Sequence, residues 1–173
     1  MPLFAWRSMQ YESHAHPFAP VMDESCSILI LGSFPSVKSR ENAFYYGHPQ
    51  NRFWKVLSAV FGEKVPLSIE EKTAFLLRHH IALWDVIASC DIVGSGDSSI
   101  KNAVPNDLNV VLRRAPVEHI LINGQTAGKL FVRHHKGLPV PYEVLPSTSP
   151  ANAGWTLDKL IGAWGERLKE RER

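Results

Sequence analysis

A chain of 173 residues, of which 45% are hydrophobic and 21% charged, is long enough for one packed core and short for two, so we expect one domain over residues 1–173. The formal charge of +2 is compatible with an anionic partner but excludes the strongly basic stripe that by itself indicates nucleic-acid binding. The two cysteines, Cys26 and Cys90, are too few for a disulfide scaffold, and no apolar run is long enough to span a bilayer. We therefore expect a cytoplasmic protein without cofactor, metal or membrane anchor.

Residues 1–25 have the irregular pattern of an arm that packs on the domain. His14 and His16 lie within one extended segment of this arm, which raises the question of a metal site. No Cys, Asp or further His follows at ligand spacing, so we do not predict one. The aromatic residues of the arm are Phe4, Trp6, Tyr11 and Phe18.

Short apolar runs alternate with amphipathic segments along the rest of the chain. The apolar runs predict strands at 27–31, 81–87, 117–122 and 141–145. Helix periodicity and capping patterns predict helices at 51–61, 68–80, 106–114, 125–132 and 157–168. The Gly/Ser/Asp-rich stretch 89–97 predicts a loop. Strands that alternate with helices imply an α/β fold with three α/β/α layers around a central, mostly parallel four-stranded sheet.

Four loops should meet at one edge of such a sheet, because parallel strands all end there. These loops, at 32–51, 85–97, 123–126 and 146–153, are rich in Ser, Thr, Asn and aromatic residues and poor in paired charges. Serine-rich turns can donate hydrogen bonds to phosphate, and aromatic rings beside amides suit a flat heterocycle. The sequence lacks the dinucleotide, P-loop, hydrolase-elbow and zincin motifs, which excludes those common site classes.

Two of these loops carry recognisable motifs. GSFPS at 32–36, followed by YYGHPQNRFW at 45–54, resembles the first motif of the uracil-DNA glycosylase superfamily, and LPSTSPANA at 145–153 resembles its second motif, a loop that presses the minor groove. HPQNRFW is also similar to the mismatch-specific uracil/thymine branch. With WDVIASC, GSGDSSI and INGQTA the chain is most similar to the hypoxanthine-DNA glycosylase branch, over about residues 20–165.

The resemblance implies a monofunctional DNA glycosylase of base excision repair. Such an enzyme flips a deaminated base out of damaged DNA, hydrolyses its N-glycosidic bond and leaves an abasic site. Cleavage of this bond leaves positive charge on the sugar and negative charge on the base. The protein must therefore orient a water molecule, donate hydrogen bonds to the leaving base and stack an aromatic ring on it. Hypoxanthine is the expected base, with uracil or xanthine as alternatives.

A non-catalytic DNA-binding member of the family and a small-molecule nucleoside or phosphoester hydrolase are the other functions considered. We expect a monomer without an iron–sulphur cluster, because the family members that carry a cluster use four cysteines and this chain has two.

The sequence departs from the family pattern at one catalytic position. The third residue of the first motif is usually an Asp or Asn that positions the attacking water, and here it is Phe34. Asn51 is our first candidate for a replacement and Asn42 our second, while His48 could assist the leaving group or phosphate. The competing interpretations are a helix cap for Asn51, plain loop for Asn42 and a loop-pinning role for His48.

The expected base-binding residues come from three loops. Tyr46 matches the ring that stacks on the flipped base, Asp85 lies where the family places a reader of the base edge, and Asn123 could read a purine. Tyr46 could instead be a core residue, Asp85 could cap a neighbouring turn, and Asn123 could serve the strand-to-helix turn. Ser33 and Phe34 complete the expected base pocket.

The expected DNA-backbone contacts lie in the two serine-rich turns. Their hydroxyl and backbone N–H groups could hold phosphate oxygens, and a residue at the tip of the second turn could enter the base stack as a wedge. For the second turn, the alternative is a Pro-bracketed turn that only leads into the last helix. The candidates are Ser36, Ser147, Thr148 and Ser149 for phosphate and Ala151 or Asn152 for the wedge.

Overall fold

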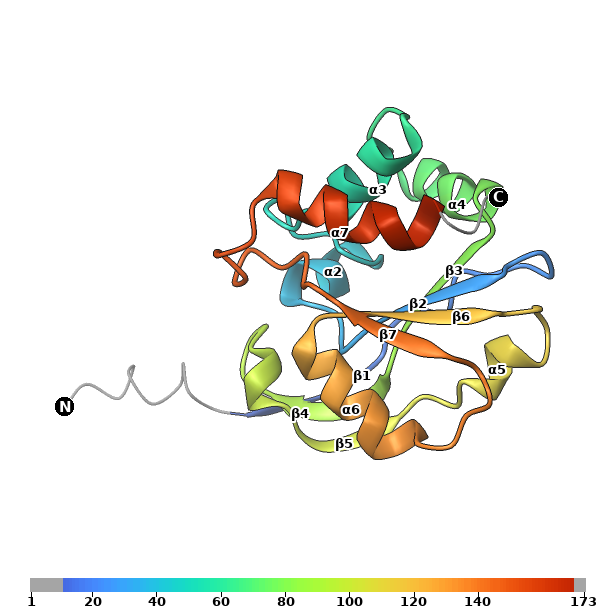
Figure 1. Ribbon diagram of the computed structural model, residues 1–173. Coiled ribbons are helices and arrows are strands. Elements are labelled where there is room, and N and C mark those ends of the chain that lie inside the picture. The colour runs from blue at the N-terminus through green and yellow to red at the C-terminus, as the bar shows by residue number, and fades with distance from the viewer. Residues whose placement is uncertain (1–10, 170–173) are drawn as a thin grey trace.

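Four parallel strands form a sheet at the centre of the protein (Figure 1). The computed structural model describes residues 11–169, and the strand order is β3 (Ile81–Asp85), β2 (Ile28–Gly32), β6 (His119–Asn123) and β7 (Tyr142–Leu145). Every residue of β2 and β3 is buried, as expected for strands covered on both faces. The predicted four-stranded parallel sheet is confirmed.

Helices cover both faces of this sheet. In Figure 1, α3 (Phe53–Phe61), α4 (Ile69–Arg78) and α7 (Leu157–Lys169) lie above the sheet, with α2 (Val37–Asn42) beside them. On the opposite face lies α6 (Gln125–His135), and the short α5 (Asn109–Leu112) precedes β6. The α/β/α layering expected from the alternation of strands and helices is therefore present.

A second, antiparallel sheet was not predicted. It consists of β1 (Glu12–Ala15), β4 (Ile87–Ile92) and β5 (Lys101–Pro105), in the order β1-β4-β5. The arm expected to be irregular thus contains a strand, and the loop expected at 89–97 is a strand up to Ile92, followed by the 3-10 helix η1 (Asp97–Ser99). Such pairings join segments far apart in the chain, so local composition does not reveal them. Phe4 and Trp6 lie outside the described residues.

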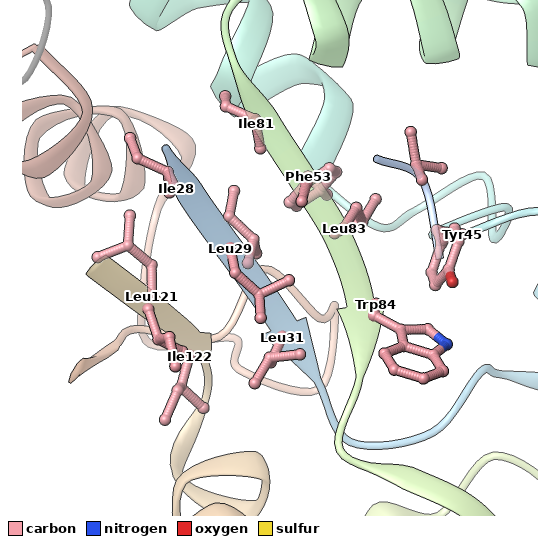
Figure 2. Packing of buried hydrophobic residues seen from close by; sticks show 14 of the residues in the cluster. Ile28, Leu29, Leu31, Tyr45, Phe53, Ile81, Leu83, Trp84, Leu121 and Ile122 are labelled. Carbon is pink, nitrogen blue, oxygen red and sulfur yellow. The ribbon is translucent and has the colours of Figure 1, made fainter. Parts of the chain in front are cut away.

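The core lies on both faces of the parallel sheet. Figure 2 shows Ile28, Leu29 and Leu31 of β2 between side chains of β3 and β6. Phe53 at the start of α3 is fully buried and packs edge-on against Trp164 of α7, with ring centroids 6.2 Å apart. This packing fixes the start of α3, and with it the loop that leads from α2 into α3.

Cys26 and Cys90 are both buried and free. Between residues 11 and 169 no helix combines the length and the apolar character needed to cross a membrane.

Candidate active site

A cavity of about 290 Å³ opens at the carboxyl-terminal edge of the parallel sheet, near the lower limit for ligand pockets and of a size suited to one base. The segments after β2, β3, β6 and β7 all contribute to its wall, so the four loops meet as expected. Of the expected site residues, all but Asn42 and Asn152 line it. Those that do are Ser33, Phe34, Ser36, Tyr46, His48, Asn51, Asp85, Asn123, Ser147, Thr148, Ser149 and Ala151.

The floor of the cavity depends on Gly32, the last residue of β2. A Cβ atom at Gly32 would lie 2.5 Å from Oδ1 of Asp85 and 2.8 Å from the hydroxyl oxygen of Tyr46. Real Cβ contacts are not that short, so only glycine allows both polar atoms to approach the strand end. The acid and the phenol therefore converge on one point of the cavity.

Tyr46 is a half-buried ring supported from behind. It stacks on Phe53 with centroids 4.1 Å apart and an angle of 21° between the planes, and it adopts a φ of +53°. Its hydroxyl is buried and lies near Asn123 without the geometry of a hydrogen bond. Burial, and after it the Asp85 carboxylate, raises the pKa of Tyr46 far above its usual range, so the side chain stays a neutral phenol.

Asp85 is held by a histidine from the N-terminal segment. Nε2 of His16 lies 2.8 Å from Oδ2 of Asp85, and Nδ1 of the same ring lies 2.7 Å from the backbone oxygen of Phe18. Both side chains are 5% exposed. The acid is thus buried and paired, and within residues 11–169 its side chain makes no hydrogen bond that would cap a neighbouring turn.

A chain of hydrogen bonds joins the two family-like motifs. Asn123 Nδ2 donates to Thr148 Oγ1 over 3.0 Å, and that hydroxyl donates to Asn51 Oδ1 over 2.9 Å. The backbone N–H of Thr148 also donates to Asn123 Oδ1 over 3.0 Å. These bonds fix which end of each amide is oxygen, because a flipped amide would lose its partners. Thr148 is fully buried, so its hydroxyl serves this chain and not a phosphate.

Asn51 has two roles that the sequence treats as alternatives. Its Oδ1 accepts the backbone N–H of Phe53 over 2.9 Å, which supports the start of α3 as a capping residue does. Together with the bond from Thr148, this occupies the carbonyl oxygen and leaves the amide NH₂ as the free donor of a cavity-lining side chain. Capping and a place in the cavity are therefore compatible.

The other two catalytic candidates are placed differently. His48 lines the cavity and accepts the backbone N–H of Gln50 on Nδ1 over 3.1 Å, so its ring pins the loop and presents an N–H at Nε2. Asn42 is exposed at the end of α2, and its amide donates to the Gly47 carbonyl over 3.4 Å. The structure thus brings His48 to the site and leaves Asn42 outside it.

Phe34 provides no polar group. Its ring is buried, packs edge-on to His16 with centroids 6.0 Å apart, and lies 5.7 Å below the Arg40 guanidinium. An apolar ring cannot orient a water molecule, so the hydrolytic group must come from another position.

Ser33 and Asp97 form a second polar pair in the cavity wall. The Ser33 hydroxyl donates to Asp97 Oδ2 over 2.7 Å. Much of Asp97 is exposed, but desolvation around its carboxyl group raises the pKa to about 6, while the bond from Ser33 acts in the opposite direction and the Asp85 charge adds to the rise.

The second motif forms a tight, internally bonded turn. Oγ of Ser147 accepts the N–H of Ser149, and Oγ of Ser149 accepts the N–H of Ala151, over 3.1 and 3.2 Å. The N–H of Ser149, one of the groups expected to hold phosphate, is therefore used within the turn, whereas the hydroxyl groups of Ser147 and Ser149 remain available as donors. Asn152 does not line the cavity, and its side-chain amide donates to the Ser147 carbonyl over 3.0 Å.

Arg52 holds this turn against the start of α3. Its guanidinium donates to the backbone oxygens of Thr148, Ser149, Asn152 and Trp155. Binding several carbonyls at once suits the planar fork of arginine, so the two motifs form one rigid unit.

Sequence reasoning missed His16, Arg52 and Asp97. From the sequence, His16 is visible only as a metal-ligand candidate, although within residues 11–169 no group of three His, Cys, Asp or Glu side chains is placed to hold a metal ion. Asp97 lies in GSGDSSI and Arg52 in HPQNRFW, so both belong to family-like motifs. Membership of these motifs could have identified Asp97 and Arg52 from the sequence. No comparable signal in the sequence indicated that His16 contacts the site.

Comparisons with known proteins agree with this geometry. A family model described as the uracil DNA glycosylase superfamily matches residues 19–167. A relative from Methanosarcina barkeri, named hypoxanthine DNA glycosylase, is 33% identical over 154 residues, which cover 88% of this chain and 96% of the relative. A relative of the same name from Methanosarcina acetivorans is 37% identical over 137 residues, 78% of this chain and 86% of the relative.

One solved structure extends the similarity to the fold. A solution NMR structure from Methanosarcina acetivorans, described as a candidate uracil DNA glycosylase, matches with a TM-score of 0.78 at 34% identity. The match covers 90% of this chain and 97% of the other.

Proposed function

Because the chain belongs to the uracil DNA glycosylase superfamily, we propose that it is a monofunctional DNA glycosylase that flips hypoxanthine out of DNA and hydrolyses its N-glycosidic bond. The reaction leaves an abasic site for base excision repair. The observation that carries the proposal is the single cavity in which a supported aromatic ring, a buried acid and the two hydrogen-bonded motifs meet. Relatives named hypoxanthine DNA glycosylase favour this base over uracil or xanthine.

The everted base stacks on Tyr46 in this proposal. One face of that ring is covered by Phe53, so the base occupies the cavity side. Stacking on an aromatic ring is available to every base, which means that Tyr46 holds the base without choosing it. The choice falls to the polar atoms at the base edge, with Asp85 and Asn123 as readers and Ser33 beside them.

The donors of the cavity suit the charge that develops in the reaction. As the bond breaks, negative charge appears on the base, and the N–H groups of Asn51 and His48, two residues of the cavity wall, supply donors to it in this proposal. Asn51 orients the water through its NH₂, because its oxygen is already occupied by Phe53 and Thr148. Since the hydrogen-bonded chain fixes this amide, its donor is preorganised before the base arrives.

The outer wall of the cavity contacts the DNA backbone. The hydroxyls of Ser147 and Ser149 donate to phosphates, whereas Ser36, whose hydroxyl donates to Ser39 Oγ over 3.0 Å, must exchange that bond to do the same. Ala151, exposed beyond Pro150 at the tip of the turn, enters the space that the base leaves. The four carbonyl bonds of Arg52 keep this turn in place against the pressure of the duplex.

The proposal also covers the oligomeric state and the cellular environment of the enzyme. The loops of all four parallel strands form one cavity wall, so we propose that the chain is a single domain and that it acts as a monomer. The two cysteines are free and buried, consistent with a reducing cytoplasm and too few for a four-cysteine iron–sulphur cluster.

Excision from defined duplexes tests this function. Labelled duplexes that contain one hypoxanthine, uracil, xanthine or undamaged adenine are incubated with the protein and then treated with alkali. We expect strand breaks at hypoxanthine that require the alkali step, since a monofunctional enzyme leaves an intact backbone. Cleavage at uracil or xanthine alone would reassign the base, and specific binding without cleavage would indicate the non-catalytic alternative.

A further inference from the structure

His16 and Asp85 form a buried acid–imidazole pair in which Asp85 lines the cavity and His16 lies behind it, and the geometry of the pair limits where its proton can lie. The Phe18 backbone oxygen only accepts hydrogen bonds, so Nδ1 of His16 must carry a hydrogen. A ring that also lacked a hydrogen at Nε2 would direct a lone pair at Asp85 Oδ2 over 2.8 Å. A proton must therefore lie between these two atoms, either on the ring or on Oδ2.

The second oxygen of Asp85 is left as an acceptor. Oδ1 lies over Gly32 at the cavity floor, and no side chain or backbone N–H between residues 11 and 169 donates to it. While the shared proton stays on the His16 side of the carboxyl group, Oδ1 has only lone pairs to offer. A base edge that meets Oδ1 must bring the hydrogen.

That requirement separates the deaminated purine from its parent. Hypoxanthine carries a hydrogen on N1, whereas adenine has a lone pair there. An acceptor aimed at N1 is satisfied by the first base and repelled by the second, and a mismatch of this kind against a buried polar group discriminates strongly.

We propose that His16 is a positioning residue that determines specificity: by holding the shared proton at Oδ2 it keeps Asp85 Oδ1 an obligate acceptor, which selects a base with a hydrogen on N1 and rejects adenine. This inference rests on the proposed function and adds the selection rule of the same site. Its basis is the His16 contacts, in which both ring nitrogens are bonded within an aromatic box of Phe18, Phe34 and Tyr45, so that the ring has one orientation.

The surroundings of Asp85 contain no substitute for His16. The other titratable groups that feel the charge of Asp85 are the phenols of Tyr45 and Tyr46 and the carboxyl group of Asp97. None of the three donates a hydrogen bond to Asp85 among the described contacts. Without His16, the buried carboxyl group could take a proton on either oxygen and donate to N1 of adenine.

Binding to uncleavable duplexes measures the selection directly. A fluorine at C2′ resists bond cleavage by disfavouring positive charge on the sugar, so duplexes with 2′-fluoro-deoxyinosine or 2′-fluoro-deoxyadenosine opposite cytosine report affinity alone. The cost of flipping each base belongs to the DNA and cancels when protein variants are compared. The measured quantity is the ratio of the two dissociation constants for each protein.

We expect His16→Leu to reduce the preference for the inosine duplex at least about tenfold, the scale of one lost or mismatched hydrogen bond. His16→Gln should keep most of the preference, because its Nε2 amide can donate where the ring nitrogen does. His14→Leu is the matched control, since His14 lies two residues away on β1, pairs only with exposed Glu12, and should leave the ratio unchanged.

A folded His16→Leu protein with the wild-type ratio would overturn the inference. If thermal melting shows that His16→Leu does not fold, His16→Gln and Asp85→Asn are compared instead. Equal ratios of the two dissociation constants for these variants contradict the proposal. A loss of preference in Asp85→Asn that His16→Gln does not show supports it. The proposed function fails separately, when the wild-type protein excises no base from the lesion duplexes.

Discussion

Thr148 and Asn51, 97 residues apart in the chain, are joined by a hydrogen bond of 2.9 Å from the threonine hydroxyl to the asparagine side-chain oxygen. The same oxygen accepts the N–H of Phe53. Asn51 therefore faces the cavity as a donor with a fixed orientation. This links the second motif to the first and makes the position of the Asn51 NH₂ group depend on both.

Asn51→Ala should lower the rate of hypoxanthine excision by about 10²–10³-fold, the scale for loss of one preorganised donor, and leave duplex affinity nearly unchanged. Single-turnover excision and a binding titration measure the two quantities. Asn42→Ala is the matched control, since Asn42 is exposed and outside the cavity. Equal activity of the two variants would move the water-orienting role away from Asn51.

Tyr46→Ala should weaken binding of a hypoxanthine duplex by about 1–3 kcal/mol, the usual scale for one lost base–aromatic stack. The comparison variant is Tyr142→Ala, which removes an exposed tyrosine of β7 remote from the cavity wall. Binding to an undamaged duplex should change less than binding to the lesion. Equal losses for both duplexes would show that Tyr46 acts on folding and not on base capture.

Gly32→Ala should abolish excision while the protein still folds. The added methyl group would displace Asp85 Oδ1 and the Tyr46 hydroxyl, which lie 2.5 and 2.8 Å from its position. Gly162→Ala is the control, because no atom lies within 4 Å of a Cβ there and alanine should stabilise α7 by about 0.5–1 kcal/mol. Normal excision by a Gly32→Ala protein would mean that these two polar atoms are not needed where the structure places them.

Asp97 should make the free energy of unfolding depend on pH. Its pKa is raised from 3.8 to about 6 by desolvation of the carboxyl group. Between those values the folded protein binds more protons than the unfolded chain, so this residue lowers stability as the pH rises through the window and adds no further change above it.

Asp97→Asn should therefore gain stability relative to the wild type from about pH 4 to about pH 7, as measured by urea unfolding. Ser33→Ala removes the hydrogen-bond donor that favours the ionised form of Asp97. In this variant the fall in the free energy of unfolding should therefore continue to higher pH than in the wild type. If the difference in the free energy of unfolding between Asp97→Asn and the wild type stays constant over this pH range, the pKa of Asp97 is not raised.

The parallel sheet and the place of the site follow from local patterns. The apolar runs at 27–31 and 81–87 have the composition of strands buried on both faces, and parallel strands must end at one edge. Because each pattern is a property of a few neighbouring residues, the sequence predicts it without knowledge of the fold. The motif resemblance then identified Tyr46, Asn51 and Asp85 as cavity residues, and the structure places all three in the wall.

Only the tertiary structure decided what these side chains contact. The antiparallel strand β1 brings the His16 segment beside β4, and the ring meets Asp85 across 69 residues of chain. Arg52 reaches Ser149 in the turn of the second motif across 97 residues, and the Ser33–Asp97 pair likewise joins two distant loops. Hydrogen bonds between distant side chains depend on strand register and on the approach of loops, and neither leaves a periodic trace in the sequence. The sequence by itself therefore determined the sheet and the edge where the site lies, whereas folding alone determined which atoms of that site are free to meet a base.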